Sequence, residues 1–171
     1  MNDIGQNIIA LFNSIRIVLA DVKKIIDLFD VIFNKNGIKL KWESSSITNG
    51  VSSSLYYPDQ WVLNGLYRIY EFSSNDIVGF NIAFSKDIEE PIFVGGKIKY
   101  QENTQPKEWD LWYIWFDWEP REKVLDGSVI NFESKDIVND QIEKIAIFAI
   151  PLKDISNRSE IEKIVLKLIN L

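Results

Sequence analysis

Apolar residues recur in alternating steps of four and three along the N-terminal part of the chain. The stripe consists of Ile4, Ile8, Leu11, Ile15, Val18, Val22, Ile25, Phe29 and Ile32, and it is widened on one side by Phe12, Leu19, Ile26 and Phe33. This spacing predicts one helix over residues 4–35, with Asp3 as its N-cap and Asn36-Gly37 as its C-terminal stop. Such a helix is about 45 Å long, whereas a compact domain of this size is about 40 Å across. We therefore expect the helix to cross the whole domain or to reach beyond it.

A series of short segments after residue 37 has the alternation of β-strands. We predict strands at residues 38–42, 66–72, 77–84, 92–100, 109–118, 129–132 and 144–152, the last of them almost wholly apolar and so covered on both faces. The serine-rich stretch 44–54 predicts a loop or an open hairpin end, and Gly95-Gly96 predicts a β-bulge or a close backbone approach. A closing helix over about 159–171 has capping-box spacing at Ser159 and Glu162.

This order of elements predicts the fold class. Short links between strands favour antiparallel pairing, because parallel strands need long crossover connections. We expect a single α+β domain over residues 1–171. In this fold a long N-terminal helix and a C-terminal helix pack on one face of a mostly antiparallel sheet of about six or seven strands.

The chain contains no cysteine and no histidine. Disulfides, thiolate nucleophiles and Ser–His–Asp triads are therefore excluded, and so is zinc bound by cysteine or histidine. A metal site would have to use carboxylates, carbonyls and water, which suit Mg²⁺, Ca²⁺ or Mn²⁺. We predict no cofactor and no metal site, and the pattern assigns no catalytic residue.

The formal net charge of −6 disfavours nucleic acid as a partner. The start of the chain lacks the basic region of a signal peptide. The apolar stretch 8–20 contains Asn13, Ser14 and Arg16 and is too short for a membrane span. We expect a soluble, cytoplasmic protein that binds neither nucleic acid nor membranes.

Aromatic and acidic residues are concentrated in residues 108–119. As a strand, this segment would have two faces that are both aromatic in the middle and acidic at one end. Flat rings beside carboxylates suit sugars or cationic groups, and this interpretation makes Trp112, Trp115, Trp118, Asp117 and Glu119 a ligand surface. The alternative is that the aromatic residues are core and that the two acids are a solvated strand end.

Two groups of carboxylates suggest a different chemistry. Asp117 and Glu119, on one side of a strand, could bind a divalent ion or act as an acid and base pair. Asp126, Glu133 and Lys135 follow the order Asp, then Glu-x-Lys. This order resembles the PD-(D/E)XK nucleases, whose acids hold Mg²⁺ and whose lysine helps to position the attacking water. The resemblance covers ten residues, and residues 136–143 are too few for the helix that this family places after the motif.

These features predict a non-catalytic binding or regulatory module. The stripe of the long helix is broader than one sheet face covers, and an exposed apolar surface of this kind favours a homodimer formed through the helix. Leu28 and Val31, off the main stripe, are expected to face the partner. The alternative is burial of the whole stripe in the monomer, and the alternative function is a carboxylate-dependent Mg²⁺ hydrolase or nuclease.

Overall fold

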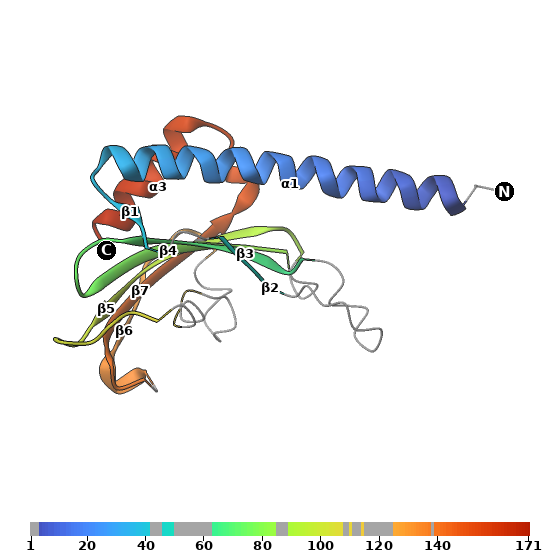
Figure 1. Cartoon of the computed structure of the whole chain (residues 1–171). Helices are drawn as coiled ribbons and strands as arrows, with labels where there is room; N and C mark the ends of the chain where they lie inside the picture. The colour runs from blue at the N-terminus through green and yellow to red at the C-terminus, as the bar shows by residue number, and fades with distance from the viewer. Residues whose placement is uncertain are drawn as a thin grey trace.

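The computed structural model describes residues 4–41, 46–49, 63–84, 89–107, 110, 114, 125–137 and 139–171, and for residues 46–49 it describes the backbone alone. The elements are α1 (Ile4–Lys35), β1 (Lys39–Leu40), β2 (Ser46–Asn49), β3 (Gly65–Glu71), β4 (Asp76–Ala83), β5 (Ile92–Tyr100), β6 (Ile130–Glu133), β7 (Ile142–Pro151) and α3 (Arg158–Ile169), with single 3₁₀ turns at Ser134–Asp136 and Leu152–Asp154. Helices α1 and α3 lie on the same face of the sheet (Figure 1). The predicted α+β class and the positions of both helices are confirmed.

The described strands form one seven-stranded sheet. The order across it is β1-β3-β4-β5-β7-β6, and β2 also pairs with β3. Every pairing is antiparallel, as the short links predict. Strand β2 falls inside the serine-rich stretch that we predicted as a loop or an open hairpin end, so part of that stretch is paired backbone instead.

The predicted bounds of α1 are confirmed, and its C-terminal end follows from local sequence. Gly37 has a φ of +77°, which L side chains adopt with strain. The Ile38 amide donates to the Phe33 carbonyl at 3.0 Å, and the Gly37 amide donates to the Asn34 carbonyl at 3.0 Å. This pair of bonds is a Schellman motif, and the accompanying contact joins Ile38 and Phe33 in one apolar cluster.

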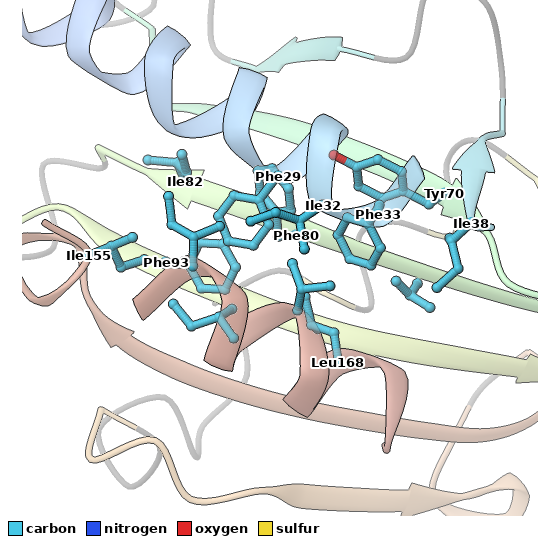
Figure 2. Packing of buried hydrophobic residues seen from close by; sticks show 14 of the residues in the cluster. Phe29, Ile32, Phe33, Ile38, Tyr70, Phe80, Ile82, Phe93, Ile155 and Leu168 are labelled. Atoms are coloured by element: carbon cyan, nitrogen blue, oxygen red, sulfur yellow. The ribbon is translucent and has the colours of Figure 1, made fainter. Parts of the chain in front are cut away.

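Closely packed aromatic rings hold the C-terminal half of α1 against the sheet. The Phe29 ring lies 4.6 Å from Phe80 and 5.3 Å from Phe93, centroid to centroid, and the Phe33 ring lies 4.1 Å from Tyr70. Figure 2 shows these rings between α1 and the strands, with Leu168 of α3 closing the cluster from the side. Val22 is the buried residue of α1 nearest to its N-terminus. The fully buried side chains of α1 therefore begin at Val22, and Ile15 and Leu19 before it are half-buried.

The second face of the sheet is buried as well. Its apolar cluster includes Tyr67, Ile69, Ile77, Val94, Ile98, Ile114, Ile145 and Ile147. Strand β7 contributes side chains to both clusters, so the predicted burial of this strand on both faces is confirmed.

Gly95 and Gly96 are sites of close approach, and they do not form a bulge. The pairing of β5 with β7 stays in register through both glycines and shifts only between Lys99 and Tyr100. A Cβ atom at Gly95 would lie 2.9 Å from Leu168 Cδ2 of α3, and one at Gly96 would lie 2.9 Å from the Ala146 carbonyl oxygen of β7.

Helix α3 begins one residue earlier than predicted and has a different cap. Asn157 is the N-cap, its side chain accepts from the Glu160 amide at 3.1 Å, and the Glu160 carboxylate accepts from the Asn157 amide at 3.2 Å. The predicted box of Ser159 and Glu162 is wrong, because two pairs with the same spacing overlap here. Glu162 instead pairs with Arg158 on the surface of the helix.

Candidate interaction surface

The N-terminal half of α1 extends beyond the described strands of the sheet (Figure 1). We call residues 4–20 the overhang. Seven of its large side chains are exposed: Ile4 by 75%, Ile8 by 50%, Ile9 by 63%, Leu11 by 61%, Phe12 by 55%, Ile17 by 64% and Val18 by 46%, while Ile15 and Leu19 are half-buried. The overhang is therefore an apolar surface that its own chain leaves largely uncovered.

Apolar residues of the overhang continue the face that packs in the other half of the helix. At about 100° per residue, Ile4, Ile8, Leu11, Ile15 and Val18 lie above the same line as Val22, Phe29 and Ile32. We call these five residues of the overhang the seam. The apolar stripe therefore continues without a break along α1, whereas the sheet packs only against its C-terminal half.

The overhang has almost no charge. Arg16 is its one ionisable side chain, although the whole chain has a formal net charge of −6. Its other polar residues are neutral: Gln6, Asn7, Asn13 and Ser14. Two copies of the overhang can therefore approach each other with little electrostatic repulsion.

A polar contact beside the aromatic cluster holds the anchored half of α1. The Asp30 carboxylate accepts from Arg68 Nε at 3.0 Å, from Arg68 Nη2 and from the Tyr70 hydroxyl at 2.6 Å. Burial and the hydrogen bond to Asp30 raise the pKa of Tyr70 above its ordinary range. Burial lowers the pKa of Arg68, but Asp30 more than offsets this and the net shift is upward. The paired, neutralised charges suit a structural tie between α1 and β3.

The predicted ligand surface belongs to the aromatic and acidic segment 108–119. Trp112, Trp115, Trp118, Asp117 and Glu119 all lie outside the described residues, so this prediction is neither confirmed nor contradicted. Within residues 109–118 the structure describes two positions, Asp110 and Ile114.

Both described positions of this segment are buried and contact the second face of the sheet. The Asp110 carboxylate accepts from the Tyr100 hydroxyl at 3.0 Å and from the Asn139 amide at 3.3 Å. Its backbone amide donates to the Lys107 carbonyl at 3.1 Å, a 3₁₀ turn in place of the predicted strand at that residue. Ile114 is fully buried and packs over Gly96, where an added Cβ atom would lie 3.2 Å from its Cγ2.

The acids and the lysine of the nuclease-like order are all exposed. Asp126 accepts from the Ser128 amide at 2.8 Å, and this bond lowers the pKa of Asp126. Glu133 begins the turn that contains Lys135. Within the described part of the chain, no three acidic side chains are grouped so that they could hold a metal ion.

A pocket of about 220 Å³ lies between the end of α1 and the edge of the sheet. It is lined by Asp30, Asn34, Ile38, Lys39, Leu40 and Tyr70. The nuclease-like set is absent from this lining. Within this lining, Tyr70 donates a hydrogen bond to Asp30, and Asp30 is also paired with Arg68, so these side chains form a structural tie.

Sequence reasoning missed the polar residues that the structure buries. Asn81 is fully buried on the second face, and neither atom of its amide has a hydrogen-bond partner among the described residues. Arg68 and Asn81 each interrupt an apolar strand in the sequence, and this interruption was the available signal.

Comparison of the chain with protein families, with curated proteins and with solved structures finds no match. Among the described helices, none combines the length and the apolar character that crossing a membrane requires.

Proposed function

We propose that this protein is a non-catalytic binding module that self-associates through the overhang. One observation carries the proposal: the seam continues a core-forming stripe beyond the core that it belongs to. Leaving apolar surface in water is unfavourable by about 25 cal/mol per Å². A second copy presents an identical seam, and a two-fold contact buries the same patch on both subunits.

The chemistry of the overhang favours a second copy over the other candidate occupants. Binding to an anionic lipid surface is typical of helices with many Lys and Arg residues on the polar face, and the overhang has only Arg16. Specific recognition of a charged partner would need charged groups beside the seam, where the neutral Asn7 and Ser14 lie. Helix-to-helix packing needs only the spacing that the seam has.

The test is a charge at the middle of the seam. Leu11→Glu places an unpaired carboxylate where the two helices would meet, and isolated buried charge is strongly unfavourable. We expect wild type to be a dimer and Leu11→Glu to be a folded monomer by light scattering at about 100 µM chain, within the range of weak protein interfaces. Because Leu11 is 61% exposed, the variant should unfold at the same temperature as the wild-type monomer.

Ile17→Glu is the matched control. Ile17 is 64% exposed, lies on the same overhang and faces away from the seam. This variant should remain a dimer. A wild type that is monomeric at this concentration, or two variants that behave alike, would contradict the proposal. Binding of wild type to neutral vesicles in place of self-association would contradict it as well.

The residues first expected at the interface are poorer test positions. Leu28 packs partly against the cluster under α1, so a charge there tests the core of the monomer. Val31 is exposed but lies on the anchored half, away from the overhang. The ligand surface at Trp112 and its neighbours stays a prediction. The absence of cysteine supports the further proposal of a cytoplasmic location.

A further inference from the structure

The direction of the partner helix follows from where the seam lies. Resting on the proposed self-association, we infer that the two overhangs pair antiparallel about a two-fold axis. In this pairing Ile8 packs beside the partner's Leu11, and Ile4 packs beside the partner's Ile15. The occupant of the seam is thus the same segment of a second copy, running in the opposite direction.

Sterics exclude the parallel arrangement. The seam faces the same side of α1 as the sheet and α3, since it continues the buried stripe (Figure 1). A partner helix on the seam therefore lies in the layer that the sheet and α3 occupy farther along. A parallel partner would extend its own anchored half directly into that sheet. An antiparallel partner extends away from it, past the N-terminal end of α1.

The spacing of the seam sets the register. Ile8 and Ile15 occupy one position of a seven-residue repeat, and Ile4, Leu11 and Val18 occupy the other. In antiparallel helix pairs the two kinds of position alternate in shared layers, which allows Ile8 with Leu11 or Ile8 with Val18. The second choice would place Ile4 opposite Val22, which is already buried by its own chain. The first choice leaves about 10 Å between Ile4 and the level of the partner's Val22.

Electrostatics agree with this direction. The two positive N-terminal ends lie about 16 Å apart along the axis in this register, and the dipole acts mainly within the first turn, so it does not oppose the pairing. A parallel pair is usually specified by opposite charges flanking its seam. The flanking positions here are Phe12 and Leu19 on one side and Asn7 and Ser14 on the other, which supply no such charges.

The absence of cysteine in the chain makes cross-linking a clean test. A disulfide needs Cα atoms about 4.4–6.8 Å apart. In the antiparallel register, Ile4 lies about 16 Å along the axis from its own copy but beside the partner's Ile15. Under mild oxidation, Ile4→Cys alone and Ile15→Cys alone should stay uncross-linked, while an equimolar mixture of the two should cross-link. A parallel pair would cross-link each variant to itself.

A second measurement avoids any change at the seam. Lys23 is exposed on the anchored half of α1, so Lys23→Cys can take a spin label without altering the overhang. Dipolar spectroscopy should give a distance of about 40 Å between the two labels in the antiparallel dimer, and well under about 25 Å in a parallel one.

The outcomes separate the two claims. A protein that sediments as a monomer overturns the proposed function and this inference together. A dimer that cross-links Ile4→Cys to itself, that shows the short distance, or that yields no cross-link in the mixture overturns the inference alone. Cross-linking in the mixture together with the long distance supports both.

Discussion

At the residue scale, the side-chain amide of Asn81 is buried on the apolar second face of the sheet. Its cross-strand partners are Tyr67 on β3 and Val94 on β5. Neither amide atom has a hydrogen-bond partner among the described residues. A buried donor or acceptor without a partner costs about 1–3 kcal/mol. The fold therefore tolerates a polar group that an apolar side chain of similar shape would improve.

We expect Asn81→Leu to raise the free energy of unfolding by about 1–2 kcal/mol, since it removes the unpaired amide. The midpoint of thermal unfolding should rise by about 2–4 °C per kcal/mol in a chain of this length. Asn139→Leu is the control, because its amide donates to Asp110 at 3.3 Å, and this variant should be destabilised. A loss of stability in Asn81→Leu would show that its amide does have a partner.

Tyr70 makes stability depend on alkaline pH. Its pKa is raised from an ordinary value of 10.0, so the folded protein keeps the phenol proton to higher pH than the unfolded chain does. The contribution of the Tyr70 proton to the free energy of unfolding is therefore fully present below about pH 10. Above that pH it falls by about 1.4 kcal/mol for each pH unit. We expect Tyr70→Phe to be about 1 kcal/mol less stable than wild type at pH 8, because the bond to Asp30 is lost.

The difference between wild type and Tyr70→Phe should shrink or reverse between pH 10 and pH 11, because the variant lacks the ionisation. Urea unfolding at pH 8, 10 and 11 measures it. A difference that stays constant over this range would mean that the folded and unfolded states hold the Tyr70 proton equally.

At the scale of the element, α1 is one continuous helix, but its two halves differ in how strongly packing stabilises them. From Val22 onward it is held by aromatic packing and by the Asp30 tie. The overhang is rich in Ile and Val, contains Gly5, and has no acidic residue in its first turn. β-Branched residues and glycine are weak helix formers, and short isolated helices are marginal in water. In a lone chain the overhang should exchange with coil.

Helix content should therefore depend on chain concentration. We expect the ellipticity at 222 nm to become more negative, per residue, as wild type is concentrated through the range in which it dimerises. Leu11→Glu should show no such change. An ellipticity of wild type that stays constant across that range would mean that the overhang is a stable helix by itself.

Elements with strong internal periodicity were predictable from the sequence. The bounds of α1 and β5 match, since an unbroken stripe and an alternating run leave few alternatives. The cap of α3 was misassigned because Asn157 with Glu160 and Ser159 with Glu162 have the same spacing. Strand β2 was missed because its pairing with β3 depends on backbone bonds in a segment without apolar alternation.

At the scale of the whole molecule, the sequence predicted that α1 would cross the domain or reach beyond it, and the structure shows that it reaches beyond. Periodicity alone does not locate the point where the stripe leaves the core, because seam residues such as Leu11 have the same character as the buried Phe29 and Ile32. That point depends on the lengths of the strands beneath the helix. Polar contacts between distant segments, such as Asp30 with Arg68, were likewise outside the reach of local pattern.

The length of α1 also has a consequence for binding strength. In the proposed dimer the two Val22 positions, where each body begins, are separated by about 37 Å along a shared axis. Any binding surface on the sheet or on the helices packed against it is then present twice in the dimer, at a fixed spacing and in opposite orientations. A ligand with two matching epitopes at that spacing would bind the second body at high effective concentration, whereas a ligand with one epitope would gain nothing. The length of the overhang thus sets the distance between the two binding surfaces. Dilution of the chain dissociates the dimer, so the bivalent receptor becomes monovalent.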